Sequence, residues 1–350
     1  MNNKTNTISN QLMRILCSVT IGFFISFSIY AQQGAGAYMD QVGANYNQIS
    51  KDTWSYIKQA SKGKNARKIE KRRMELTNSL KYAKDQAQRL KPYEGDAAYR
   101  DAVVQYLSLC YFSINNDYKK LVDMEAIAEE SYDDMEAYLL TKERIELKMD
   151  SAKNALDFEV EAFAKRNNVR LIEKESKLSE KIGNANEVTA YYNKVFLIYY
   201  KSAWYEQEMV KAISEKRISE VEQFRQVLEI NSKEGMAQLK AMAPFRNDPD
   251  LKDAGYSMLE FYYGEAVRYM PEQVAFFVKS DKMNTLQKNI ESKKRKDLTQ
   301  QEIDEYNKAV KDYNNSIGEY NKTNDYLNKY RTLRREKFDK AIDNLYSRHI

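Results

Sequence analysis

The feature that most constrains the fold is a short turn that occurs twice, 152 residues apart. The first copy is Pro92-Tyr93-Glu94-Gly95-Asp96 and the second is Pro244-Phe245-Arg246-Asn247-Asp248. In each copy the proline ends the incoming helix, and Gly95 or Asn247 suits a left-handed backbone. Asp96 or Asp248 is then placed to cap the outgoing helix. The chain therefore contains two similar helix-turn-helix arrangements.

The similarity extends well beyond the turn. An ungapped comparison of Ile69–Tyr111 with Val221–Tyr263 contains 11 identical residues in 43 positions. Further upstream, Tyr46 matches Tyr199 at a spacing of 153, so we place a one-residue slip near Lys62-Gly63-Lys64. A period this long indicates two duplicated domains and not a solenoid of short repeats.

The composition indicates helices. Only 11 glycines and 4 prolines occur in 350 residues, with no proline between Pro92 and Pro244. Sheet proteins need more turn residues than this. We predict an all-α fold of two tandem, duplicated antiparallel helical bundles with long coiled-coil-like helices. We assign residues 32–170 to the first bundle, 171–187 to a linker broken at Gly183-Asn184-Ala185-Asn186, and 188–350 to the second bundle.

Two local patterns refine this prediction. Arg73 lies on the apolar seam of its helix one turn after Glu70, and Arg225 and Glu222 repeat the arrangement. We expect an Arg–Glu pair at the bundle edge, with a snorkelling surface arginine as the alternative.

The second pattern is a heptad seam near the carboxyl terminus. Thr299-Gln300-Gln301-Glu302 has the form of a capping box, and a seven-residue rhythm follows at Ile303, Tyr306, Val310, Tyr313, Ile317, Tyr320 and Leu327. We expect this helix to pack on its own domain, with a free stalk or a second subunit as the alternatives.

The amino terminus has the form of an export signal. Lys4 and Arg14 precede an apolar run from Ile15 to Ile29, which ends at Tyr30-Ala31. We predict a signal peptide at residues 1–31 and an exported protein of the periplasm, cell surface or extracellular space. An uncleaved membrane anchor is the alternative, and we expect no transmembrane helix in the mature chain. Of the two cysteines, Cys17 lies within the predicted signal peptide. Cys110 lies in an apolar helical run, and we expect it to be a buried small hydrophobe.

The charged residues point to no nucleic-acid partner, because a net charge of +5 is small beside 56 basic and 51 acidic residues. The basic residues that could bind a polyanion, or simply form solvated faces, are Lys64, Arg67, Lys68, Lys71, Lys293, Lys294, Arg295 and Lys296.

Few residues suited to catalysis are present. The only histidine is His349, where we expect a frayed and exposed tail, and no glycine-rich phosphate loop occurs. We therefore predict no catalytic, metal or cofactor site, and a non-enzymatic binding or scaffold protein whose partner is an envelope protein or polysaccharide. The alternative is a glycan hydrolase or lyase with paired carboxylates, for which the Asp123–Glu136 segment is notable.

Four segments resemble a family of uncharacterised bacterial surface proteins made of long helices. They are Lys71-Arg72-Arg73, Tyr93-Glu94-Gly95-Asp96, Met135-Glu136-Ala137-Tyr138-Leu139-Leu140 and Glu305-Tyr306-Asn307-Lys308-Ala309-Val310. The resemblance covers most of the mature chain. It implies a location in the envelope and supplies no catalytic residues.

Overall fold

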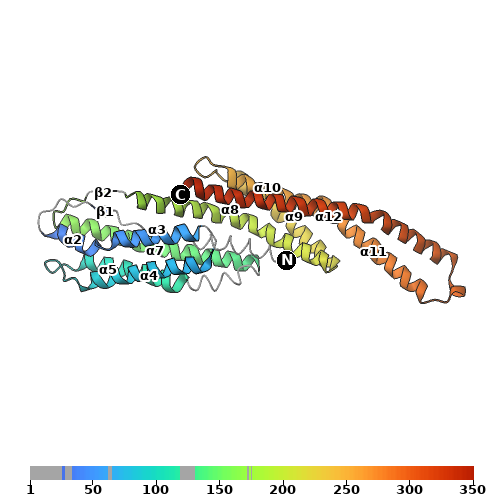
Figure 1. The fold of residues 1–350 in the computed structure, drawn as a ribbon, viewed down its shortest axis with the longest axis horizontal. Helices are drawn as coiled ribbons and strands as arrows, with labels where there is room; N and C mark the ends of the chain where they lie inside the picture. Colours follow the sequence, from blue (N-terminus) through green and yellow to red (C-terminus); the bar gives the residue numbers. More distant parts are fainter. Residues whose placement is uncertain (1–25, 28–33, 62–64, 119–130, 172, 175) are drawn as a thin grey trace. The chain divides into compact units, whose positions relative to one another are not determined.

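The computed structural model describes residues 26–27, 34–61, 65–118, 131–171, 173–174 and 176–350 (Figure 1). The described part is all-α, as the composition predicts. The chain divides into two compact units. Unit 1 comprises residues 1–193 and 346–350, and unit 2 comprises residues 194–345. Apart from Ser26 and Phe27, the predicted signal peptide lies outside the described residues.

Unit 1 is a bundle in which neighbouring helices run side by side (Figure 1). Its helical elements are α2 (Ala35–Gly43), α3 (Tyr46–Ala60), α4 (Ala66–Arg89), α5 (Ala98–Phe112), the π-helical turn η1 (Ser113–Asp117), α7 (Tyr132–Arg166) and the first part of α8 (Lys177–Ser214). Helix α4 packs between α3 and α5, and α5 also packs on α7. The only strands among the described residues are β1 (Ser26–Phe27) and β2 (Glu173–Lys174), which pair antiparallel with Ser26 opposite Lys174.

Aromatic rings form one end of the core of unit 1. The ring of Phe163 lies 5.2 Å from Tyr99, 5.8 Å from Tyr93 and 5.9 Å from Tyr38, measured between ring centroids. Cys110 is fully buried on α5, and burial raises the pKa of its thiol to about 12. The predicted role of Cys110 as a buried small hydrophobe is therefore confirmed.

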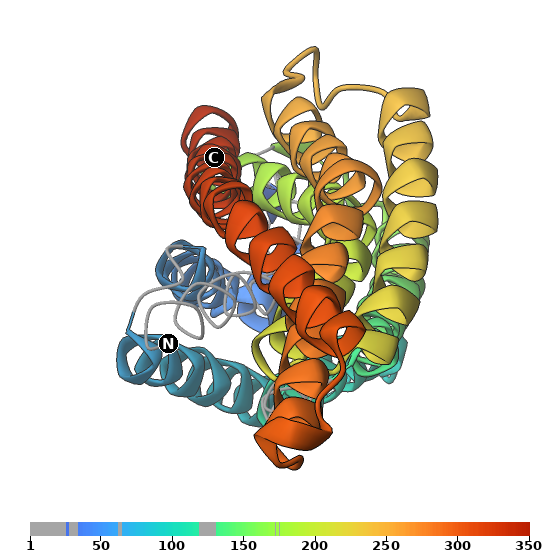
Figure 2. The ribbon, with the colours of Figure 1, turned by 90° about the vertical axis from the view of Figure 1, so that its right-hand side faces the viewer.

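Unit 2 repeats the helix-turn-helix and adds a long hairpin. It contains the rest of α8, then α9 (Ile218–Ala241), α10 (Asp250–Gly264), the π-helical turn η2 (Glu265–Tyr269), α11 (Met270–Glu291), the 3-10 turn η3 (Arg295–Asp297) and α12 (Gln300–His349) up to Leu345. Figure 2 shows α9 and α10 side by side. A Cβ atom at Gly235 would come within 2.8 Å of Leu259, so this glycine lets α9 approach α10 closely.

The two turns have nearly the same geometry. Gly95 and Asn247 have φ of +88° and +66°, the left-handed backbone that the residue types predict. The Oδ1 atom of Asp96 accepts a hydrogen bond from the Ala98 N–H at 2.9 Å, and Asp248 accepts one from the Asp250 N–H at 3.1 Å. Helices α4 and α9 end three residues before Pro92 and Pro244 respectively.

One detail of the predicted caps is corrected. The helices begin at Ala98 and Asp250, so Ala97 and Pro249 hold the N-cap positions and each aspartate lies one residue earlier. Both N-cap residues have near-helical backbone angles. Each aspartate therefore bonds the N–H two residues ahead, as in an Asx turn, instead of the deeper N–H groups that an N-cap reaches.

The predicted linker at 171–187 is wrong over most of its length. Helix α8 runs from Lys177 to Ser214 without interruption, through Gly183-Asn184-Ala185-Asn186, and the boundary between the units follows Asn193. Glycine and asparagine are poor helix formers, by up to about 1 kcal/mol each. Burial of Ile182, Ala185 and Val188 offsets that preference.

Asn115-Asn116-Asp117, a run of residues typical of a turn, lies within the wider helical turn η1. The corresponding turn η2 lies 152 residues later and leads directly into α11, with Pro271 in the first turn of that helix, where a proline is tolerated. A π-helical turn leaves a backbone carbonyl without its usual α-helical donor. In both units an arginine supplies one: Arg73 Nη1 donates to the Ile114 carbonyl at 2.8 Å, and Arg225 Nη1 to the Ala266 carbonyl at 3.4 Å.

The predicted Arg–Glu pairs are present on the same arginines. Arg73 donates to both carboxylate oxygens of Glu70 at 2.7 and 2.8 Å, and Arg225 does the same with Glu222 at 2.6 and 2.9 Å. Each arginine thus joins its own helix to the π-helical turn of the neighbouring helix.

The carboxyl terminus is more ordered than predicted. Helix α12 continues to His349, which is half-buried, and Ile350 packs against the unit 1 cluster of Ile57, Ile182 and Ala185. The apolar residues that end α12 are buried, including Ala341, Ile342 and Leu345, and this packing holds the last turns in place.

Candidate functional site

The first basic cluster lies at the start of α4 in unit 1. Arg67, Lys68 and Lys71 are exposed there, and Lys64 lies outside the described residues. The backbone N–H of Lys68 donates to the Asn65 side chain, which caps the helix. These three side chains present positive charge to solvent.

The second cluster lies at the tip of the hairpin between α11 and α12 in unit 2. Lys293 pairs with Glu302, whose pKa is lowered to about 2 by the hydrogen bond from Lys293 and then by those from Thr299. The backbone N–H of Thr299 donates to Glu302 and the N–H of Glu302 donates to Thr299 Oγ1, so the predicted capping box is confirmed. Within the described residues, Lys294, Arg295 and Lys296 make no side-chain hydrogen bond or ion pair.

The acidic segment Asp123–Glu136 is only partly described, because residues 119–130 lie outside the described ranges. Asp133 and Asp134 occupy the first turn of α7, where acidic side chains complement the helix dipole. Ser131 caps this helix, since its Oγ accepts from the Asp134 N–H at 3.0 Å. The described part of the segment therefore has a structural explanation.

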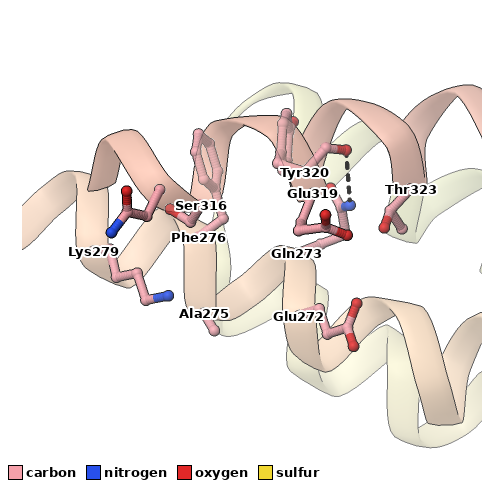
Figure 3. A pocket seen from close by; sticks show the side chains of 10 residues that line it. Glu272, Gln273, Ala275, Phe276, Lys279, Ser316, Glu319, Tyr320 and Thr323 are labelled. Atoms are coloured by element: carbon pink, nitrogen blue, oxygen red, sulfur yellow. Dashed lines mark hydrogen bonds between the residues drawn. The ribbon is translucent and has the colours of Figure 1, made fainter. Parts of the chain in front are cut away.

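A cavity of about 320 Å³ lies between α11 and α12 (Figure 3). It is open to solvent on one side and contains both polar and aromatic side chains. The lining residues are Glu272, Gln273, Ala275, Phe276 and Lys279 from α11, and Asn315, Ser316, Glu319, Tyr320 and Thr323 from α12.

The aromatic part of the cavity comes from the heptad seam. Phe276 stacks on Tyr320 with ring centroids 4.0 Å apart and on Tyr313 with centroids 5.3 Å apart. These contacts confirm that the seam packs on its own domain. The seam tyrosines remain only half-buried, because a hairpin of two helices covers one side of each ring.

Gln273 is the most deeply buried polar group of the cavity, with 1% of the residue exposed. Its Nε2 atom donates to the backbone carbonyl of Tyr320 at 3.5 Å, drawn as a dashed line in Figure 3. Since a carbonyl oxygen only accepts, the amide orientation follows, and Oε1 is left as the free acceptor. Oε1 has no hydrogen-bond partner among the described residues. A buried acceptor without a donor is costly, and its place beside a cavity suits a bound donor.

A second group of buried charges lies elsewhere in unit 2. Arg331 on α12 pairs with Glu206 on α8 and with Glu265, the first residue of η2. We call these three residues the ionic cluster. All three are buried, and Glu265 is fully buried. Burial alone would lower the pKa of Arg331, but the charges of Glu206 and Glu265 outweigh it and raise that pKa.

The ionic cluster suits a structural role better than a chemical one. Its guanidinium is shared between two carboxylates, and Arg331 Nη1 also donates to Asn328 Oδ1 at 2.9 Å. Buried ion pairs of this kind can specify one register of packing. We interpret the cluster as the contact that fixes α12 on α8 and η2.

Sequence reasoning missed both Gln273 and the ionic cluster. Glu206 follows Trp204-Tyr205 and is the first carboxylate after the aromatic run that begins at Tyr191, which was a usable signal. Gln273 carried no comparable signal, because a glutamine on an amphipathic helix is most often exposed.

The described residues contain no cluster of three or more His, Cys, Asp or Glu side chains arranged to hold a metal ion. Within the same residues, no helix is both long and apolar enough to cross a membrane. Comparisons of the chain with models of protein families, with curated proteins and with solved structures found no match.

Proposed function

We propose that the protein is an exported, non-enzymatic helical protein that binds or scaffolds a component of the cell envelope. The observation that carries the proposal is the cavity between α11 and α12, where a buried amide oxygen without a hydrogen-bond partner lies beside aromatic rings. Binding pockets commonly combine an apolar wall with a few placed polar groups in this way.

The amino-terminal pattern supports the location. The charged start, the apolar run from Ile15 to Ile29 and the small-residue exit at Ala31 are typical of a secretory signal. The ionic cluster also supports the proposal, because it fixes α12 on α8 and η2 within unit 2. The hairpin of α11 and α12, which contains the cavity, continues beyond α9 and α10 (Figure 1).

The test combines fractionation with capture. Cells that produce the full chain are fractionated and treated with protease, and purified protein of residues 32–350 is mixed with protein-free envelope polysaccharide or with solubilised envelope protein. The Ala275→Trp variant fills the cavity. Asn289→Trp places the same side chain at the same heptad position, two heptads along α11 and outside the cavity.

We expect the unmodified protein and Asn289→Trp to retain an envelope component, and Ala275→Trp to lose it. The proposal is wrong if the chain stays with the cytoplasm, or if the unmodified protein retains nothing.

A carboxylate enzyme acting on glycans is the second candidate. One observation favours it: Glu272 and Glu319 line the same cavity from opposite helices, as paired carboxylates do in glycoside hydrolases. Turnover of an envelope polysaccharide that is lost in Glu272→Gln or Glu319→Gln would support the enzyme and exclude the non-enzymatic proposal.

A polyanion-binding protein is the third candidate, favoured by the exposed Lys294, Arg295 and Lys296 at the hairpin tip. Affinity for a sulfated polysaccharide should then fall steeply with salt concentration. Replacing these three residues by glutamine should reduce both the affinity and the salt dependence, and binding that ignores salt would exclude this candidate.

A further inference from the structure

We propose that the cavity between α11 and α12 binds a saccharide unit, with Gln273 Oε1 accepting a hydrogen bond from a sugar hydroxyl. This inference rests on the proposed binding function and names the chemical class of its ligand. Three features of the cavity lead to it: the free acceptor, the mixed polarity of the rim and the aromatic wall.

The free acceptor requires a ligand that donates. Gln273 is buried between the helices, and its Nε2 already faces the Tyr320 carbonyl. Oε1 is shielded from solvent, so bulk water does not satisfy it. A ligand hydroxyl that enters between the rim side chains would satisfy it and also bury the surrounding apolar surface.

The rim requires a ligand that donates and accepts in turn. Glu272 and Glu319 supply acceptors, whereas Lys279 supplies donors and Asn315 supplies both. Ser316 Oγ donates to the Tyr313 carbonyl at 2.7 Å, so its lone pairs remain available to accept. A sugar carries many hydroxyl groups that each donate and accept, and it matches this mixture without adding a net charge.

The rim also disfavours an anionic ligand, which would meet the carboxylates of Glu272 and Glu319 beside a single lysine, Lys279. A neutral, hydroxyl-rich ligand avoids this repulsion. Its apolar ring face can pack beside Phe276 and Tyr320, which form the aromatic wall.

The size is consistent with a short saccharide. About 320 Å³ lies near the lower end of the range for small-molecule sites. The open side of the cavity leaves room for a longer chain to continue into solvent. The ligand is therefore a sugar unit of either a free oligosaccharide or an envelope polysaccharide.

The test uses calorimetric titration of the purified protein of residues 32–350 with three defined probes. The probes are an N-acetylglucosamine tetramer, maltotetraose and, as a charged comparison, a sulfated heparin oligosaccharide. The key variant is Gln273→Leu, which leaves an apolar side chain in the buried position and removes the acceptor together with the amide that bonds Tyr320. Gln287→Leu is the matched control, because it lies two heptads along α11 and does not line the cavity.

We expect at least one neutral probe to bind, and its affinity to fall by about tenfold or more in Gln273→Leu with little change in Gln287→Leu. Hydrogen exchange of residues 272–279 and 315–323 should slow when the probe is added. This second measurement also shows whether each variant is folded.

Three outcomes would overturn the inference: no neutral probe binds, Gln273→Leu binds as well as the unmodified protein, or protection appears outside the cavity. Binding of the heparin probe alone would also overturn it, in favour of the polyanion candidate. If Ala275→Trp abolishes capture of an envelope component while no saccharide binds, the proposed function stands and only the saccharide class is wrong.

Discussion

The two units use the same backbone devices but different buried chemistry. Both contain the Pro…Asp turn and a π-helical turn, and each of these features recurs at a spacing of 152 residues. In both units an arginine donates a hydrogen bond to a backbone carbonyl of the π-helical turn. At two core positions, however, unit 1 has Thr53 and Ser113 where unit 2 has Glu206 and Glu265, at spacings of 153 and 152. All four residues are buried.

The difference shows which contacts tolerate change. Thr53 is satisfied within its own helix, since its hydroxyl donates to the Ile49 carbonyl at 2.8 Å. Glu206 and Glu265 instead need the guanidinium of Arg331. The backbone geometry of a π-helical turn demands an external donor in either unit, whereas the residue that begins the turn can be neutral or charged if its surroundings match.

The largest expected effect comes from removing the cation of the ionic cluster. Arg331→Met leaves two carboxylates buried without their partner and should destabilise unit 2 by about 3–5 kcal/mol. Hydrogen exchange measured on peptides of α10 and α12 in the full chain would report the loss. Adding Glu206→Gln and Glu265→Gln to Arg331→Met should recover part of it, and a single variant as stable as the parent would contradict the structural role of the cluster.

A smaller effect is expected from the arginines that the two units share. Arg73→Ala and Arg225→Ala each remove a charged donor from a backbone carbonyl, together with an Arg–Glu pair. Each change should cost about 1.5–3 kcal/mol in its own unit. The Arg73 change should cost more, because its carbonyl bond is 2.8 Å long and that of Arg225 is 3.4 Å.

Local hydrogen exchange at η1 and η2 separates the two arginine effects. Faster exchange at both turns in both variants would contradict the expectation that each arginine acts only on its own unit.

Replacing the turn aspartates should cost on the order of 1 kcal/mol each. Part of the loss in Asp96→Ala should come from its pair with Arg166 on α7 at 2.9 Å. Thermal melts followed by peptide-resolved exchange would measure the loss in each variant, and an Asp96→Ala variant as stable as the parent would contradict the assigned role of this side chain.

The same aspartate predicts a pH dependence. The Ala98 N–H and then Arg166 lower the pKa of Asp96 below its unfolded value. A lowered pKa in the folded state means that the stabilisation is complete above about pH 4 and is lost as the pH falls through the folded pKa. Asp96→Asn does not titrate, so its stability difference from the parent should disappear at low pH. A difference that persists unchanged at about pH 2 would contradict this assignment.

The smallest expected effect is a gain in folding stability, and it tests the difference between the two units at corresponding positions. Ser113 Oγ is buried and has no hydrogen-bond partner among the described residues. Ser113→Ala should therefore leave unit 1 equally stable or raise its stability by up to about 1 kcal/mol. Glu265→Ala, at the corresponding position, should destabilise unit 2 by leaving Arg331 with one carboxylate. Chemical denaturation of both variants would test this, and a loss of stability in Ser113→Ala would reveal an unseen partner.

Much of the local structure follows from the sequence alone. The left-handed positions at Gly95 and Asn247, the capping box at Thr299 and the heptad seam of α12 each depend on residues close together in the chain. Local steric and hydrogen-bonding preferences act over a few residues, so the residue types predict these features. The two Arg–Glu pairs, three residues apart, belong to the same class.

Other features depended on tertiary structure. The helix through Gly183–Asn186 persists because burial of Ile182, Ala185 and Val188 outweighs local preference. Arg331 meets Glu206 and Glu265 across 125 and 66 residues of sequence. Gln273 has a free acceptor because Tyr320, 47 residues away, presents a carbonyl to its amide nitrogen. Composition and periodicity predict which faces are apolar, but only packing between distant helices decides which polar groups become buried and which of those are satisfied.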